Sequence, residues 1–333
     1  MRREVVVNGR FLTRRVSGVE RYGRETLRWI GNRCRVEKPK GALNGMAGHA
    51  WEQFILPVRT RSNSVLWSPA NSGPLFVRDQ VLTIHDLSPL EHPEWFQPNY
   101  AAWYCLLLPM LVRRVQRIIT LSEYISKKVV MRFSLPADKV VTIPAGVDTS
   151  KFHLQDVSSG MERYILFVGT LEPRKNILGL LSAWDRIKGR HPDVVLVIAG
   201  TSGRVFKESS YPNSTDRVRW LGYVPDTGLP ALYAGADLFI LPSLDEGFGL
   251  PALEAMACGT PVVVSDGGAL PEIVSDAAMI FNLSNPFGLS DAINECLLNS
   301  NLRTSLKEMG LTRAKLYSWQ STAESVWNCL HEI

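Results

Sequence analysis

LDEGFGLPALEAMACGTPVV, residues Leu244–Val263, has the composition of a loop that leads into a helix. Pro251 suits the first turn of that helix, where a missing N–H costs nothing, and Gly247 and Gly249 permit positive φ or a close backbone approach. A helix start carries unpaired amide N–H groups and the positive end of the helix dipole, and both attract anions. The stretch therefore predicts a pyrophosphate site on the amides around Gly249 and Leu250.

Two carboxylates flank this predicted helix start. Glu246 precedes the turn and Glu254 lies about one turn inside the helix, with seven residues between them. A carboxylate near a helix N-terminus contributes roughly 0.3–1 kcal/mol through the dipole alone, and this accounts for Glu254. It does not account for Glu246 beside two glycines, so we expect one carboxylate to face a sugar and the other a ribose.

Apolar runs alternate with helical patterns along the whole chain, as parallel strands do in α/β proteins. In the first half the predicted strands are Glu4–Asn8, Ser64–Trp67, Val81–Ile84, Ile118–Leu121 and Val140–Ile143. In the second half they are Tyr164–Val168, Val194–Ala199, Val218–Leu221, Leu238–Leu241 and Pro261–Val264. The sequence thus predicts two doubly wound parallel sheets.

Length and composition indicate how these sheets are divided. A chain of 333 residues, 45% of them hydrophobic, can bury two cores more readily than one. Residues 144–162 are rich in Pro, Gly, Ser and Asp and read as a linker. We predict Rossmann-like domains at 1–150 and 151–333, facing each other across a cleft lined by the carboxyl ends of their strands. The last segment, Trp319–Ile333, is predicted to be a helix that can pack back on the first domain.

Arg174 and Lys175 are adjacent and follow a predicted strand, so they can hold a diphosphate. On their own they would be read as an exposed turn after Pro173, but the helix start and the glutamates favour the clamp. The chain has no two aspartates separated by one residue, and its six histidines show no ligand spacing. We therefore expect no metal and no cofactor.

Several segments resemble one family. EGFGLPALE is similar to the paired-glutamate motif of the retaining glycosyltransferase family 4, enzymes of the two-domain GT-B fold, and VGTLEPRKN and AGVD resemble the family's phosphate-binding strand end and linker signature. IHDLSPLEHPEWF and SGVERY resemble segments of a bacterial subgroup that builds surface polysaccharides, often as mannosyltransferases. Residues 33–49 depart from the family pattern, because they are short, Gly-rich and without strand alternation.

The resemblance implies a retaining transfer from a nucleotide diphosphate sugar, with GDP-mannose as the best candidate, to a lipid-linked glycan in O-antigen or lipopolysaccharide synthesis. It implies front-face attack, in which the departing phosphate oxygen takes the acceptor proton, Glu246 positions the sugar, His85 contacts it and Glu254 binds the ribose. The predicted catalytic residues are Glu246, His85, Arg174 and Lys175. The predicted substrate-binding residues, mostly at strand ends, are Gly18, Asp86, Ser122, Gly169, Thr170, Tyr223, Val224, Gly247, Phe248, Gly249, Leu250 and Glu254.

Charge is unevenly distributed. Residues 1–150 carry 22 Lys and Arg against 12 Asp and Glu, whereas the remainder carries 15 against 20. A basic cluster, Arg113–Arg132, follows the apolar run Ala101–Val112, which reads either as a core helix or as an interfacial one. The five cysteines are dispersed and fit a reducing compartment. We expect a cytoplasmic protein, peripheral at the inner face of the cell membrane, and the alternative for the basic half is a solvated surface.

Other functions fit less well. Gly9, Gly18 and Gly23 lack the dinucleotide spacing of an NAD-dependent oxidoreductase. A nucleotide-sugar epimerase or hydrolase would need the same diphosphate clamp and stays open, as does a non-catalytic sugar-binding protein. Dispersed basic residues with few aromatic platforms argue against nucleic acid as a partner.

Overall fold

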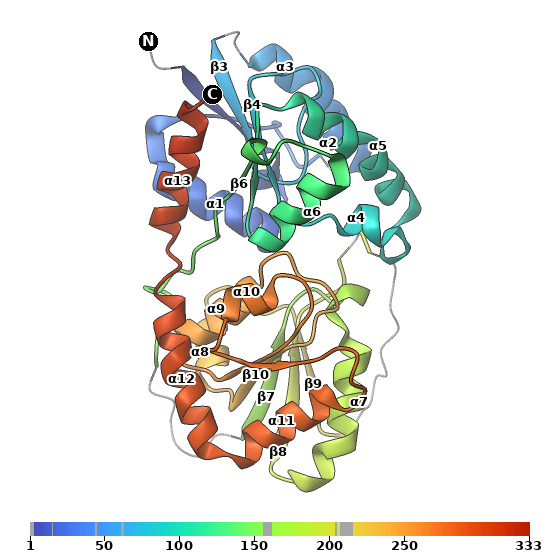
Figure 1. Ribbon diagram of the computed structural model, residues 1–333, viewed down its shortest axis with the longest axis vertical. Coiled ribbons are helices and arrows are strands. Elements are labelled where there is room, and N and C mark those ends of the chain that lie inside the picture. The colour runs from blue at the N-terminus through green and yellow to red at the C-terminus, as the bar shows by residue number, and fades with distance from the viewer. Residues whose placement is uncertain are drawn as a thin grey trace. The chain divides into compact units, whose positions relative to one another are not determined.

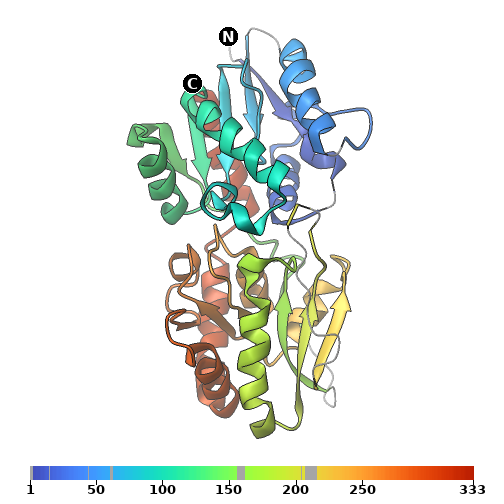
Figure 2. The same cartoon turned by 90° about the vertical axis from the view of Figure 1, so that its right-hand side faces the viewer.

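The computed structural model describes residues 3–14, 16–43, 45–60, 63–155, 162–203, 205–206 and 216–333. The chain divides into two compact units. The first unit comprises Met1–Pro93, Pro98–Gly146 and Trp319–Ile333, and the second comprises Glu94–Gln97 and Val147–Ser318. Each unit has one six-stranded parallel sheet with helices on both faces (Figures 1 and 2). The predicted pair of doubly wound sheets is confirmed.

The first sheet has the strand order β2-β1-β3-β4-β5-β6, and all neighbours run parallel. The chain passes from β1 to one edge and then returns to the other side of β1, so the order reverses between β1 and β3. The strands are β1 Glu4–Asn8, β2 Arg35–Glu37, β3 Ser64–Ser68, β4 Gln80–Ile84, β5 Arg117–Thr120 and β6 Val140–Thr142.

The helices of the first unit cover both faces of this sheet. They are α1 Gly18–Ile30, α2 Gly45–Ala50, α3 Leu56–Arg59, α4 Ser88–Glu91, α5 Pro98–Arg114, α6 Glu123–Phe133 and α13 Trp319–His331. The last of these, α13, lies beside α1, and Trp319 packs edge-on against the buried Tyr22 at 6.1 Å between ring centroids (Figure 1). Thr322 Oγ1 donates to the carbonyl of Pro144 (2.7 Å), so the last helix is also tied to the end of the first sheet.

Helix α5 contains the apolar run that had two interpretations. Its inner face, including Leu108 and Leu111, is buried against the sheet, whereas Leu106 and Met110 on the other face are exposed. Pro109 lies within the helix and does not end it. No helix in the described part of the chain is long and apolar enough to cross a membrane.

The second sheet has the order β12-β11-β10-β7-β8-β9, again with parallel neighbours, and the order reverses between β7 and β10. Its strands are β7 Arg163–Val168, β8 Val194–Ala199, β9 Val218–Gly222, β10 Leu238–Leu241, β11 Val262–Ser265 and β12 Met279–Phe281. Its helices are α7 Ile177–Ile187, α8 Leu229–Ala234, α9 Leu250–Ala257, α10 Leu270–Val274, α11 Gly288–Leu298 and α12 Ser300–Ala314.

One expectation about the first sheet was wrong. Residues 33–49 were expected to lack a strand, but β2 lies there and pairs with β1 through Val36 opposite Val7. The strand has three half-buried residues and charged side chains at both ends, so it shows no apolar run. Part of the predicted linker, residues 156–161, lies outside the described residues.

Candidate active site

The reversal of strand order in the second sheet brings two loops together. Strands β7 and β10 are neighbours, with Leu238 opposite Ile165, although 69 residues separate the end of one from the start of the other. Their carboxyl ends therefore release the segments Gly169–Lys175 and Pro242–Gly249 side by side, at the position where open α/β sheets bind ligands. Leu244 N donates to the carbonyl of Arg174 (2.8 Å) and joins the two loops.

Three of the predicted catalytic residues meet at this point. Lys175 Nζ lies 2.5 Å from Glu246 Oε2, and Arg174 NH1 lies 3.1 Å from Glu246 Oε1. Ser243 Oγ also donates to Glu246 Oε2 (3.1 Å). Glu246 and Lys175 are both buried. The carboxylate is thus fixed between two cations, away from bulk water.

The charge state of Glu246 follows from these neighbours. Burial alone would raise the pKa of its carboxyl, but Arg174 and Lys175 outweigh burial and lower the pKa to about 2. Glu246 is therefore ionised at neutral pH. It is charged and oriented, as a group that stabilises a developing positive charge must be.

Glu172 was missed by the sequence analysis. Its Oε1 accepts hydrogen bonds from Nε (3.0 Å) and NH2 (2.7 Å) of Arg174, and only 2% of the residue is exposed. Burial raises the pKa of the Glu172 carboxyl, against the lowering effect of Arg174 and Lys175. A glutamate two residues before Arg174 was visible in the sequence, but an acid beside Pro173 reads as an exposed turn.

The predicted helix start is present, and two glycines shape it. Gly249 precedes α9 with φ 94°, and a Cβ there would lie 2.6 Å from Leu270 Cδ2. Gly268, after β11, has φ 69°, and a Cβ there would lie 2.3 Å from both N and O of Glu246. Ala269 N donates to the carbonyl of Glu246 (2.7 Å). Gly268 was not predicted, and its only signal was its position after a strand end.

The remaining predicted residues of the second unit line strand ends or α9. Glu254 is 4% exposed and its Oε2 accepts from the hydroxyl of Tyr233 (3.0 Å). The other predicted residues lie after β7 (Gly169, Thr170), after β9 (Tyr223, Val224) and in the loop and first turn of α9 (Gly247, Phe248, Leu250). Tyr223 is 55% exposed, whereas Phe248 is buried.

Four predicted residues belong to the first unit. His85 follows β4 and is buried, and its Nε2 lies 2.7 Å from the carbonyl of Pro69. Because a carbonyl only accepts, Nε2 carries the proton and Nδ1 is an acceptor. Burial lowers the pKa of His85, in agreement with a neutral ring. Asp86 Oδ1 accepts from Ser88 N (3.0 Å) and so orients the following loop.

The other two lie at helix starts. Gly18 is the first residue of α1, which begins with a capping box between Ser17 and Glu20. Ser122 caps α6, and its Oγ accepts from Ile125 N (3.3 Å). Among the residues that the structure describes, no group of three or more His, Cys, Asp or Glu side chains could hold a metal ion.

Comparison with known proteins identifies the family. The model of glycosyl transferases group 1 matches residues 149–313, and the model of glycosyltransferase family 4 matches residues 61–151. The O-antigen chain mannosyltransferase B of Escherichia coli is 34% identical over 262 residues, which is 74% of this chain and 69% of that protein. The chain belongs to glycosyltransferase family 4.

Two further comparisons describe this glycosyltransferase more closely. The serotype-specific mannosyltransferase WbdA of Escherichia coli is 30% identical over 73% of this chain, but the match spans only 32% of WbdA. The crystal structure of Anabaena Alr3699/HepE in complex with UDP-glucose superposes with a TM-score of 0.74 at 17% identity, covering 99% of this chain and 100% of that one. This likeness shows the fold, and the predicted GT-B architecture of the glycosyltransferase is confirmed.

Proposed function

We propose that the enzyme transfers a mannosyl residue, with retention of configuration, from GDP-mannose to a lipid-linked glycan during synthesis of a bacterial surface polysaccharide. The observation that carries the proposal is the buried contact of Glu246 with Arg174 and Lys175 at the switch point of the second sheet. Two relatives, named an O-antigen chain mannosyltransferase and a serotype-specific mannosyltransferase, support the sugar and the pathway.

The geometry suggests a separate role for each charged residue in this reaction. Arg174 and Lys175 hold the donor diphosphate, so its oxygens compete with Glu246 for the same cations. Once the diphosphate takes these N–H groups, the Glu246 carboxylate is released toward the sugar. The bond from the sugar C1 to the diphosphate oxygen breaks, the acceptor oxygen bonds to C1 on the same face, and the departing phosphate oxygen takes the acceptor proton. Glu172 keeps Arg174 in place throughout.

The proposal is tested with a panel of nucleotide diphosphate sugars in a thermal-shift experiment. A ligand at a hundred times its Kd stabilises the protein by about 2.7 kcal/mol, so the true donor stands out against the others. GDP-mannose should give the largest shift. A larger shift with another nucleotide sugar would reject GDP-mannose while keeping the transferase.

An epimerase or hydrolase of the same fold is separated by the products. A transferase releases nucleotide at an appreciable rate only when an acceptor glycan is added. Release at the same rate without acceptor would favour a hydrolase, and a changed sugar still attached to the nucleotide would favour an epimerase.

Glu254→Ala should raise the Kd for the donor roughly 10- to 150-fold, because we assign this carboxylate to the ribose hydroxyls and a charged hydrogen bond contributes roughly 1.5–3 kcal/mol. Titration calorimetry with the nucleoside diphosphate measures the change. Tyr233→Phe, which removes only the hydroxyl that donates to Glu254, is the control and should have a smaller effect. An unchanged donor Kd in Glu254→Ala would reject the ribose assignment.

Activity should survive EDTA. The fixed positive charges of Arg174 and Lys175 can neutralise the diphosphate, which is the task of a divalent ion in metal-dependent enzymes. Initial rates measured with an excess of EDTA, which chelates Mg²⁺ and Mn²⁺, should equal those without it. Loss of activity that returns on adding magnesium or manganese would contradict this.

We expect the enzyme to bind anionic vesicles more tightly than neutral ones and to release them as salt rises. Arg113, Arg114, Lys127 and Arg132 are exposed on the first unit and form the basic surface. Each cation near an anionic surface contributes about 1 kcal/mol, so Arg113→Gln with Arg114→Gln should lower the binding constant roughly 30-fold. Sedimentation with phosphatidylglycerol vesicles measures this.

The matched control removes the same charge elsewhere. Arg190 and Lys315 are exposed on the second unit, and Arg190→Gln with Lys315→Gln should leave vesicle binding unchanged. Equal binding to neutral and anionic vesicles, or equal losses in the two double variants, would mean that the basic surface is only solvated.

A further inference from the structure

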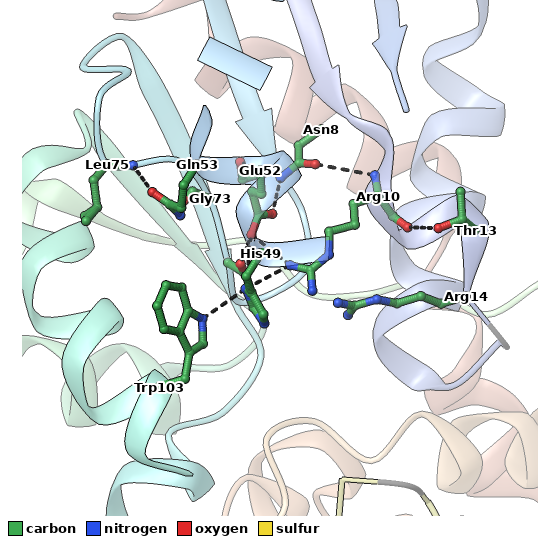
Figure 3. Close-up of polar contacts among 12 residues, drawn as sticks. Asn8, Arg10, Thr13, Arg14, His49, Glu52, Gln53, Gly73, Leu75 and Trp103 are labelled. Carbon is green, nitrogen blue, oxygen red and sulfur yellow. Dashed lines mark hydrogen bonds and ion pairs between the residues drawn. The ribbon is translucent and has the colours of Figure 1, made fainter. Parts of the chain in front are cut away.

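The first sheet has a switch point of its own, between β1 and β3, and a buried polar cluster lies beside it (Figure 3). Arg10 lies in a 3₁₀ turn, Gly9–Thr13, directly after β1. His49 lies near the end of α2, and Glu52 lies in a short π-helical segment, Trp51–Ile55. Arg10, His49 and Glu52, here named the Arg10 cluster, are each more than nine-tenths buried.

Glu52 ties the cluster to the ends of both strands. Its Oε1 accepts from Nδ2 of Asn8 at the end of β1 (2.6 Å), and the same Nδ2 reaches Oγ of Ser68 at the end of β3 (3.4 Å). Its Oε2 accepts from Arg10 NH1 (2.9 Å) and from the hydroxyl of Ser72. Because open parallel sheets bind ligands at switch points, this is a position for a second ligand site.

The contacts of His49 fix its tautomer. Its Nδ1 lies 3.0 Å from Arg10 NH1 and 2.9 Å from Nε1 of Trp103. A guanidinium and an indole N–H only donate, so Nδ1 is unprotonated and the proton sits on Nε2. Burial lowers the pKa of His49, which agrees with a neutral ring. The Nε2 proton can therefore be offered to an anion.

Arg10 has donors that its protein neighbours do not use. Its Nε and NH2 are buried and have no hydrogen-bond partner among the described residues, so three of the five N–H groups of the guanidinium lack an acceptor. Buried donors of this kind are costly and rare, and they point to an acceptor supplied from outside. The unmatched edge faces Gly48, where a Cβ would lie 2.7 Å from Nε.

A second guanidinium lies close to the first. The side chain of Arg14 extends toward Arg10 and His49 (Figure 3), and its positive charge contributes, after burial, to lowering the pKa of His49. Arg14 is 28% exposed and its ion pair with Glu20 is loose, at 3.9 Å. Two guanidinium groups and an imidazole N–H form a donor set that suits the several oxygens of a phosphate.

An apolar groove of about 240 Å³ lies next to the cluster, and Trp103, whose indole N–H donates to His49, lines it. Phe54, Phe76, Leu106 and Met110 line the groove and are 69%, 71%, 60% and 40% exposed. These four residues and Trp103 are here named the apolar groove. Gln53 also lines the groove. Its Nε2 donates to the carbonyl of Gly73 (2.9 Å), and its Oε1 accepts from Leu75 N (3.0 Å). Large apolar side chains gathered on a surface mark a binding site for an apolar partner.

We propose that the Arg10 cluster, Arg14 and the apolar groove bind the lipid end of the acceptor, with a phosphate group on the guanidinium groups and a hydrocarbon chain along the groove. The proposal rests on the proposed function, in which the acceptor is lipid-linked. A purely apolar partner would leave the donors of Arg10 unmatched, and a free phosphate would leave the groove exposed. A chain with a phosphate at one end matches both.

The test uses decyl phosphate, with inorganic phosphate and decyl maltoside as the two half-ligands, each below its micelle concentration. Binding is measured by calorimetry on the full chain saturated with a nucleoside diphosphate, so that the clamp of the second unit is already occupied. We expect decyl phosphate to bind at least tenfold more tightly than either half-ligand. Equal affinity for decyl phosphate and decyl maltoside would indicate a non-specific apolar surface. Equal affinity for decyl phosphate and inorganic phosphate would indicate only an anion site. Either result overturns the proposal.

Matched variants locate the site. Arg14→Gln should weaken decyl phosphate at least tenfold and leave decyl maltoside unchanged, whereas Phe76→Ser with Leu106→Ser should weaken both amphiphiles. Arg28→Gln on α1 removes a more exposed charge elsewhere, and Leu178→Ser on α7 removes an apolar side chain about as exposed as Leu106; both should change nothing. Equal effects of the test and control variants would reject the site.

Failure of this site can be told from failure of the proposed function. Donor binding resides in the second unit, so the thermal shift with the nucleotide sugar should be the same in Arg14→Gln as in the wild type. If the donor still binds and is transferred while decyl phosphate shows no preference, only the lipid site is wrong. If no nucleotide sugar binds the wild type, the proposed function itself fails.

Discussion

Replacing Glu246 with alanine is expected to lower kcat by roughly 10²–10³-fold while the Kd for the donor changes little, because the loss of one preorganised charge acts mainly on the transition state. The carboxylate is buried against Arg174 and Lys175, and in the proposed reaction the diphosphate competes with it for these cations. Its removal therefore frees the clamp and gives no reason for weaker donor binding. Steady-state kinetics and calorimetry with the donor measure the two quantities.

Lys175→Ala should also lose turnover far more than donor affinity, because the charge on the leaving diphosphate grows in the transition state. Glu308→Ala, an exposed acid on α12, is the control and should leave both quantities unchanged. Glu246→Gln keeps the shape and removes the charge. If Glu246→Ala weakened donor binding as much as turnover, Glu246 would be a ground-state ligand and not a transition-state group.

Replacing Glu52 with alanine is expected to lower the free energy of unfolding of the first unit by about 3–5 kcal/mol, because it leaves the guanidinium of Arg10 buried without a counter-charge. Urea unfolding followed by circular dichroism measures the change. Glu4→Ala is the control: Glu4 also pairs with an arginine, Arg35, but both side chains are about one-third exposed, and such pairs contribute less than about 1 kcal/mol.

The same pair gives a pH dependence. Burial alone would raise the pKa of Glu52, but the guanidinium of Arg10 and the hydroxyl of Ser72 lower it from 4.5 to about 2. A carboxyl whose pKa is lower in the folded than in the unfolded state contributes its full stability above the unfolded pKa. That contribution is lost as the pH falls through the folded pKa. The wild type should lose this stability between about pH 4.5 and 2, and the difference from Glu52→Ala should shrink there. A pH-independent difference would contradict the ionised pair.

Strands with long apolar runs could be predicted from the sequence nearly to the residue. Predicted and observed bounds agree for β1, β8 and β10, whose interiors are buried on both faces and therefore read as continuous Val, Ile and Leu. The edge strands β2 and β12 were missed. Each has only three residues, at least two of them not buried, and three residues are too few to show a strand pattern in the sequence.

The candidate site was predicted in its anion-binding parts but not in its supporting ones. Arg174, Lys175 and Glu246 stand out because charged residues beside glycines after strands have few structural uses. Glu172 and Glu52 do not stand out, since a buried acid and a surface acid look the same in a sequence. Only the folded chain brings each beside the arginine that compensates its charge.

Helix α13 has a consequence for the order in which the protein is made. The first unit needs α13 against α1, with Trp319 on Tyr22 and Thr322 on Pro144, yet α13 follows the whole second unit in the sequence. Domains usually fold in the order in which they leave the ribosome. Here the first unit is synthesised first but cannot complete its fold until α13 has been made. While residues 147–318 are being synthesised, the nascent first unit lacks α13, and the apolar side of α1 that α13 covers stays exposed.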